Sequence, residues 1–245
     1  MNPISDFIFV QTQAIKESFR SLKHLPMLAL HIFIYAVVHT GIAMLLVFTG
    51  IAWGFMGGVL LYLVRAMLFS HLLYTMEGII ETDRFYLKHI KEGFTRYLSP
   101  VINTFFLYYI FTMLLDAILG TGSYQPMVYL LLELLLYWAC SAFGETIYIG
   151  KIFGYNSAMS GLNFVFENPL NWGFVNILFF GLGYFLRLDL NLISSFPGQI
   201  SIANPVGNLI YLVLISALLI YRGHLYKLLH RSSIRGREYQ RRHGE

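Results

Sequence analysis

Long apolar runs dominate this chain, and their length constrains the fold more than any other feature. A helix that crosses a bilayer needs about 20 consecutive apolar residues. Six segments approach that length, and charged residues make up only 12% of the chain, whereas a soluble domain carries roughly 25%. We therefore predict an all-α fold, a polytopic membrane helical bundle with about six transmembrane helices: Met27–Phe48, Ala52–Met76, Val101–Leu119, Met127–Phe143, Leu170–Leu186 and Val206–Tyr221.

A single membrane domain accounts for the length of 245 residues. Residues 1–26 are interpreted as an N-terminal amphipathic segment, 27–221 as the six-helix bundle and 222–245 as a basic tail. The first apolar run begins only after Pro26, too late for a secretory signal, so we expect no cleavage.

The distribution of Lys and Arg predicts the orientation of the bundle. Of the 17 basic residues, 15 fall in segments that an even number of spans places on one side of the membrane. The exceptions are Arg65, inside a span, and Arg187. Basic loops stay in the cytoplasm, so we predict a cell (inner or plasma) membrane protein with both termini cytoplasmic. The same clustering beside apolar spans argues against nucleic acid as the partner of the positive charge.

Three segments of the chain resemble one another, which predicts an internal repeat. Each has a short amphipathic stretch, then Pro26, Pro100 or Pro169, then a span. Proline suits the first turn of a helix, where its missing N–H costs nothing. We predict three two-helix repeats, each preceded by a cytoplasmic amphipathic helix; the alternative is that proline is simply common before membrane helices. The first amphipathic stretch is predicted to place Phe7, Val10, Ala14, Phe19 and Leu22 on one interfacial face.

Two opposite charges lie inside predicted spans, where a charge usually faces a partner or a cavity. A shift of 68 residues aligns the second predicted helix with the fourth and carries Arg65 onto Glu133. We predict that Arg65 and Glu133 form an intramembrane charge pair. It is either a neutral strut between repeats, which we favour, or part of an ion or proton path.

Three further charged residues end spans on the basic side. The alignment makes Glu77 and Glu145 equivalent, and a looser one places Arg222 at the matching position of the sixth span. We predict a polar cluster of Glu77, Glu145 and Arg222 at the cytoplasmic face. The alternative is that these are ordinary interfacial residues.

No catalytic, cofactor-binding or metal-binding motif is present in the sequence. His31, His39 and His71 lack the spacing of metal ligands, and Ser, His and Asp residues occur without a spacing that assembles them. The only cysteine, Cys140, is interpreted as a small buried apolar residue. We expect no resident cofactor, and an ATP-driven role would need a partner subunit.

Two stretches carry a family resemblance: "GKIFGYNSAMSGLNFVFENPLNWGF" and "IANPVGNLIYLVLISALLIYRGHLYKLL". The chain resembles the YciC-like bacterial inner-membrane proteins and the related membrane domain found beside some glycerophosphodiester phosphodiesterases. One departure is "GTGSYQPMVYL", where such proteins often show a Pro-Gly step that opens the fourth span. The resemblance implies a multi-pass bacterial membrane protein without an established activity.

Three functions follow as hypotheses. The first is a non-enzymatic membrane component, such as a permease-like subunit or a partner of a transport or envelope-maintenance system, with a membrane protein or an ATPase as its partner. The second is a membrane-embedded enzyme that acts on lipid headgroups, with Glu77, Glu81, Asp83, His89 and Glu145 as its candidate polar groups. The third is a scaffold or immunity-type protein.

Overall fold

The structure is a computed structural model that describes residues 3–50, 55–85, 90–119, 126–186, 188, 204–232, 236–237 and 239. Within these residues every regular element is a helix. In chain order they are α1 (Pro3–Ser21), a 3₁₀ turn (Leu22–His24), α2 (Leu25–Phe48), α3 (Phe55–Thr82), α4 (Ile90–Arg96), α5 (Leu98–Leu119), α6 (Pro126–Cys140), α7 (Phe143–Tyr148), α8 (Tyr155–Glu167), α9 (Pro169–Leu186) and α11 (Pro205–Arg231).

The prolines of the sequence mark helix beginnings. Pro26 lies in the first turn of α2, Pro169 is the first residue of α9, and Pro205 is the first residue of α11. These positions suit proline because the first N–H groups of a helix have no intrahelical acceptor. At α11 the side chain of Asn204 also accepts a hydrogen bond from the backbone N–H of Gly207, at 2.8 Å, and so caps the helix.

Five helical segments are long and apolar enough to cross a membrane. They are Ile4–Phe48, Phe55–Thr82, Leu98–Leu115, Pro169–Leu186 and Pro205–Arg231. Five of the six predicted spans overlap these segments. The chain therefore has the architecture of a multi-pass helical membrane protein in contact with a lipid bilayer.

The fourth predicted span, Met127–Phe143, differs from the others. It corresponds to α6, which has 15 residues and ends at Cys140. At a rise of about 1.5 Å per residue such a helix is about 22 Å long, shorter than the roughly 30 Å hydrocarbon layer. The chain turns at Ser141 and Ala142 before α7 begins. A sixth crossing stays a prediction.

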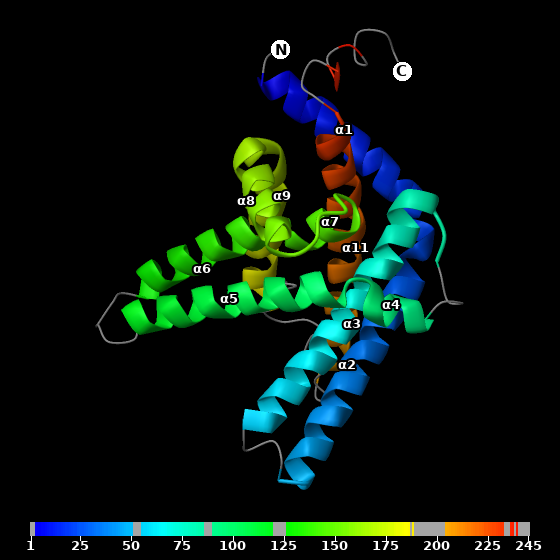
Figure 1. The fold of residues 1–245 in the computed structure, drawn as a ribbon. Coiled ribbons are helices and arrows are strands. Elements are labelled where there is room, and N and C mark those ends of the chain that lie inside the picture. The colour runs from blue at the N-terminus through cyan, green and yellow to red at the C-terminus, as the bar shows by residue number, and fades with distance from the viewer. Residues whose placement is uncertain are drawn as a thin grey trace.

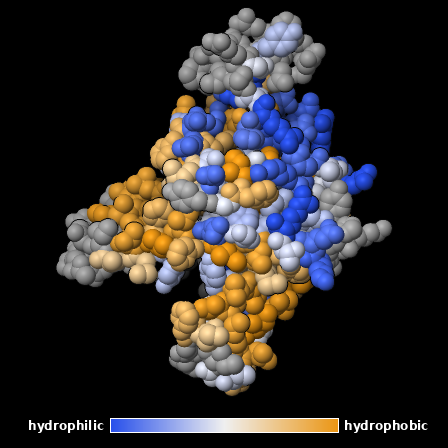
Figure 2. Space-filling model, in the orientation of Figure 1, coloured by the Kyte–Doolittle hydropathy of each residue, from blue (hydrophilic) through white to orange (hydrophobic). Residues whose placement is uncertain are grey.

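The helices form two apolar arms that diverge from a common centre (Figure 1). One arm is the α2–α3 hairpin and the other is the α5–α6 pair, while α9 and α11 run beside each other. Apolar residues cover both arms (Figure 2). Hydrophilic residues gather at the opposite side, over α1, α4 and the last turns of α3 and α11, which we call the charged end.

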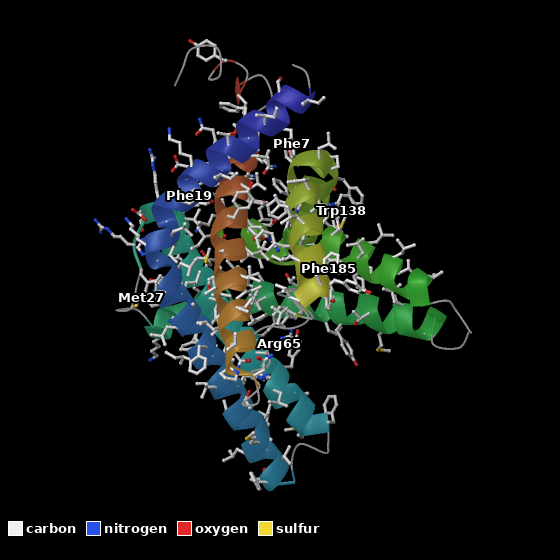
Figure 3. The ribbon with its side chains drawn as sticks, turned by 180° about the vertical axis from the view of Figure 1, so that it is seen from behind. Phe7, Phe19, Met27, Arg65, Trp138 and Phe185 are labelled. Carbon is white, nitrogen blue, oxygen red and sulfur yellow. The ribbon has the colours of Figure 1, made fainter. Side chains whose placement is uncertain are left out.

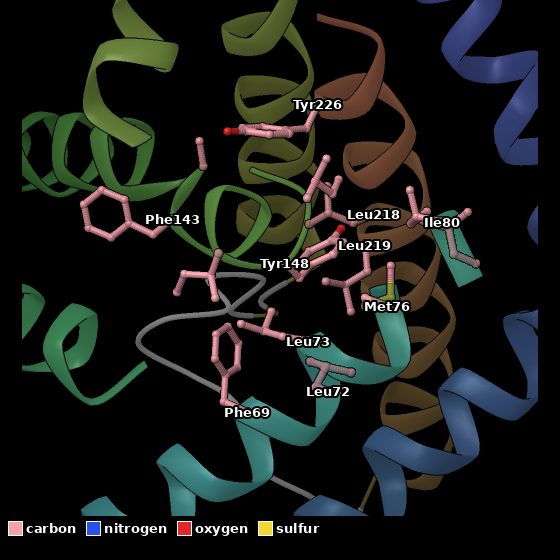
Figure 4. Packing of buried hydrophobic residues seen from close by; sticks show 14 of the residues in the cluster. Phe69, Leu72, Leu73, Met76, Ile80, Phe143, Tyr148, Leu218, Leu219 and Tyr226 are labelled. Atoms are coloured by element: carbon pink, nitrogen blue, oxygen red, sulfur yellow. The ribbon is translucent and has the colours of Figure 1, made fainter. Parts of the chain in front are cut away.

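The core lies where α3, α7 and α11 meet (Figure 4). Leu73 and Met76 of α3, Tyr148 of α7 and Leu218 of α11 are almost fully buried there. Gly223 permits this close approach, because a Cβ at its position would lie 2.7 Å from the hydroxyl of Tyr148.

Helices α4, α8 and α1 each pack on a helix from another part of the fold, namely α3, α7 and α11. On α3, the Ser70 hydroxyl donates to the carbonyl of Gly93 in α4, at 2.9 Å. On α7, Phe143 packs against Gly161 of α8.

The residues predicted to form the interfacial face of α1 do not all lie on one side of the helix, so this prediction is wrong. Val10 and Ala14 are buried, whereas Phe19 is 68% exposed. The reason is helical geometry: at about 100° per residue, Phe19 lies on a different side of the helix from Val10 and Ala14. The buried side of α1 faces the protein.

Candidate functional site

Glu145 and Arg222, two of the three residues predicted to cluster at the charged end, form a buried ion pair. Nη2 of Arg222 in α11 lies 3.0 Å from Oε2 of Glu145 in α7, and the two side chains are 3% and 2% exposed. The guanidinium also lies over the ring of Trp172, 5.1 Å from its centroid. Burial raises the pKa of Glu145, and the Arg222 guanidinium opposes that rise. The pair holds α7 against α11.

Glu77, the third predicted member, has other partners. It accepts hydrogen bonds from the hydroxyl of Tyr97, at 2.7 Å, and from Arg96, at 3.1 Å, and it pairs with Lys151. Lys151 also donates to the Tyr97 hydroxyl, at 3.0 Å. Burial and the neighbouring Glu77 carboxylate raise the pKa of Tyr97. The predicted cluster is thus divided between two separate charge networks.

A pocket of about 640 Å³, lined by both charged and apolar side chains, opens between the ends of α1, α3 and α11. Glu81 lies in it between two bases, 2.7 Å from Arg231 and 3.6 Å from Lys227. We call this cavity the α1–α3–α11 pocket. Three acidic and three basic side chains contribute to its lining, which consists of Glu17, Arg20, Ser21, Ile79, Ile80, Glu81, Thr82, Asp83, His224, Lys227, Leu228, Arg231 and Ser232.

The wall of this pocket contains a serine–histidine contact that sequence reasoning missed. Oγ of Ser21 lies 2.9 Å from Nε2 of His224, although the residues are 203 positions apart. No spacing pattern can reveal such a pair, because the packing of α1 on α11 brings it together. Asp83 lines the same pocket and is held by Lys23 and by His24, the latter at 2.9 Å. These contacts, that with Lys23 first, lower the pKa of Asp83.

Two histidines meet within the α2–α3 arm. Nε2 of His31 lies 3.1 Å from Nδ1 of His71, and the hydroxyl of Tyr35 contacts both nitrogens. This is a hydrogen-bonded trio of two imidazoles and a phenol. Among the described residues, no group of three or more His, Cys, Asp or Glu side chains is arranged to hold a metal ion.

The predicted pair of Arg65 and Glu133 is only partly visible. Arg65, labelled in Figure 3, lies on α3. Its guanidinium is 5.0 Å from the centroid of the Phe105 ring and so links α3 to α5. Glu133 belongs to α6, and its side chain lies outside the described part of the structure. The same holds for His89. The ion pair stays a prediction.

Among the described residues, the Glu145–Arg222 pair is buried, the Glu77 network is half-buried, and the α1–α3–α11 pocket is open with balanced charges. Comparison with known proteins adds no identity: no protein-family model, no curated protein and no solved structure matches the chain.

Proposed function

We propose that this chain is a non-enzymatic integral membrane protein that serves as the membrane partner of a cytoplasmic protein, as a permease-like subunit of a transport or envelope-maintenance system does. One observation carries the proposal. The α1–α3–α11 pocket lies at the charged end and presents acids and bases side by side, with Glu81 held between Lys227 and Arg231. Such an alternating surface suits a charged segment of a partner protein, because opposite charges across an interface determine register and specificity.

The proposed orientation places both termini and the charged end in the cytoplasm. Asp6 and Arg237 form a buried ion pair with an N–O distance of 2.9 Å, which keeps the two ends of the chain together. Lys151 pairs with Glu77, so the segment after α6 returns to the side from which α5 departs. These contacts support an even number of passages through the membrane, with the α5–α6 arm as one outward and one returning segment.

The proposed threefold repeat is supported by the way the helices that precede the proline-marked spans pack. Helix α4 lies on α3, α8 lies on α7 and α1 lies on α11. Each of the three thus packs on a helix that follows an outward segment of another repeat. Repeats around a central site are a known plan of transporters. In this scheme Arg65 and Glu133 form a strut between repeats. We also propose that the chain is related to the YciC-like membrane proteins that it resembles.

Co-purification with a charge reversal in the pocket tests the proposed partner. Tagged protein is extracted from its native membrane in a mild detergent, and bound proteins are quantified by mass spectrometry. Glu81→Lys places a third positive charge beside Lys227 and Arg231 and should release the partner. Glu167→Lys, the same change at an exposed position of α8, should retain it. If the parent protein purifies alone and changes no solute flux in vesicles, the proposal fails.

A second candidate is an enzyme that acts on lipid headgroups, and the Ser21–His224 contact favours it. A hydroxyl bonded to an imidazole is the first requirement of a serine nucleophile, and a third group normally orients the base. A fluorophosphonate probe should then label the parent protein and not the Ser21→Ala variant. Ser18→Ala is the control, because the Ser18 hydroxyl donates only to the Ala14 carbonyl of its own helix.

A scaffold or immunity-type role is the remaining alternative, and it shares the need for a protein partner. It differs from a transport role in one measurable respect. A permease-like subunit changes solute flux when reconstituted with its partner, whereas a scaffold does not.

A further inference from the structure

Helix α1 has a buried side that anchors it to the rest of the molecule. Val10 and Ala14 are fully buried. The Gln11 amide donates to the carbonyl of Asn171 in α9 at 2.9 Å, and its oxygen accepts a hydrogen bond from the hydroxyl of Tyr221 in α11. These contacts hold α1 on α9 and α11, so the direction in which its other sides point is determined.

A second side of α1 exposes large apolar residues. Ile4, Ile8, Ile15 and Phe19 are 67%, 59%, 45% and 68% exposed. At about 100° per residue these four side chains fall within roughly 60° of one another around the helix. They form an apolar stripe along the helix, which we call the α1 stripe. Figure 3 marks Phe19 toward the end of α1 that leads into α2.

A third side of α1 carries exposed bases. Lys16 and Arg20 lie one turn apart beside the α1 stripe, whereas Lys23 belongs to the following 3₁₀ turn and pairs with Asp83. Long basic side chains next to an apolar face are the pattern of a helix that lies in the membrane interface, with its bases reaching the phosphates of the headgroups.

The length of the helical segment excludes a transmembrane position for α1. Residues Ile4–Phe48 form one helical run of 45 residues, and α2 alone has 24. About 20 residues suffice to cross the hydrocarbon, so α2 takes up the whole layer. The 3₁₀ turn at Leu22–His24 separates the two helices, and His24 there contacts the carboxylate of Asp83 at 2.9 Å. The chain therefore leaves the hydrocarbon near His24.

We propose that α1 lies in the headgroup region of the leaflet beside the charged end, with the α1 stripe among the acyl chains and its bases at the lipid phosphates. Lipid is the occupant because the stripe continues a surface that faces lipid: it leads into the span α2 at one end. Toward the other end α1 lies against the span α9, where the ring of Phe7, on the buried side of α1, packs edge-on against Phe174, 5.2 Å between centroids, and Phe174 is a half-exposed residue of α9.

Spin labels on single-cysteine variants test this placement. The buried Cys140 is first changed to alanine, and cysteines are introduced one at a time at Ile4, Ile8, Ile15 and Lys16 in the full chain. Each labelled protein is placed in vesicles of phosphatidylethanolamine and phosphatidylglycerol. Power saturation then measures the access of oxygen, which concentrates in hydrocarbon, and of a water-soluble nickel complex. A retained thermal midpoint shows that each variant is folded.

The expected result is an oxygen-to-nickel accessibility ratio several-fold higher at the three isoleucine positions than at Lys16. Equal and high nickel access at all four positions would place the stripe in water and overturn the proposal. Low access of both reagents at the isoleucine positions would also overturn it, because a second copy of the chain would then cover the stripe.

Discussion

The guanidinium of Arg222 lies 3.0 Å from the carboxylate of Glu145, and neither side chain is more than 3% exposed. Removing two charges from water costs several kcal/mol per ion, which their attraction offsets only while both are present. The pair therefore makes the α7–α11 contact sensitive to the loss of either partner.

Glu145→Gln should destabilise the protein by about 3–5 kcal/mol, because it leaves the Arg222 charge buried without a counter-ion. Denaturant unfolding in detergent micelles measures this. The double change Glu145→Leu with Arg222→Met should recover most of the loss, since it removes both desolvation costs. The control is Glu17→Gln, which breaks an exposed pair with Arg20 and should cost less than about 1 kcal/mol. If Glu145→Gln and Glu17→Gln lowered the free energy of unfolding equally, this account would be contradicted.

Gly223→Ala should destabilise the core by about 1–3 kcal/mol, the usual cost of overpacking. The new Cβ would meet the Tyr148 hydroxyl at 2.7 Å and Ile80 at 2.8 Å, in a region without free space. Gly41→Ala in α2 is the matched control, because nothing lies within 4 Å of the position of its Cβ. The control should be neutral or slightly stabilising, and thermal melting of both variants decides the comparison.

Asp83 should make the contact between the start of α2 and the end of α3 sensitive to acid. Its contacts with Lys23 and His24 lower its pKa, so the stabilisation that they supply is present above the unfolded-state value of about 4 and is lost as the pH falls through the lower folded-state value. Asp83→Asn should therefore be less stable than the parent at neutral pH. The difference in melting temperature should shrink as the pH falls below about 4. A difference that does not change with pH would contradict the assignment.

The predicted pair of Arg65 and Glu133 can be tested by charge exchange. If the two side chains form a strut, Arg65→Glu and Glu133→Arg should each lower the amount of folded protein in the membrane. The double exchange should restore it, because the pair is re-formed in reverse. A Glu133→Gln variant that folds normally but abolishes transport would instead support an ion or proton path. Fluorescence-detected size exclusion reports folding, and flux assays report transport.

Reporter fusions should place three segments on one side of the membrane. Fusions after Arg96, after Lys151 and in the tail after Arg231 should all report the cytoplasm, with a fusion after Thr49 on the other side as the control. This outcome requires α6 to return the chain to its starting side, despite its 15 residues. A Lys151 fusion on the opposite side from the tail would overturn the topology.

The sequence by itself determined where the long apolar helices lie and that they belong in lipid. Apolar run length and proline position are local properties: Pro26, Pro100 and Pro169, the expected prolines, lie at or near the first residues of α2, α5 and α9. The short α6 is the exception: its apolar run continues to Phe143, yet the helix ends at Cys140, where the chain turns into the core. A hydropathy profile cannot detect such a break, because it reports only how apolar the residues are and not where the backbone turns.

Only the tertiary structure decided which side chains meet. Glu145 and Arg222 are 77 positions apart, and Ser21 and His224 are 203 positions apart. Glu77 was expected beside Arg222 but is held by Tyr97, Arg96 and Lys151 instead. The physical reason is that ion pairs and hydrogen bonds act over a few ångströms. Their partners are therefore determined by which helix ends converge, and that depends on how all the helices pack together.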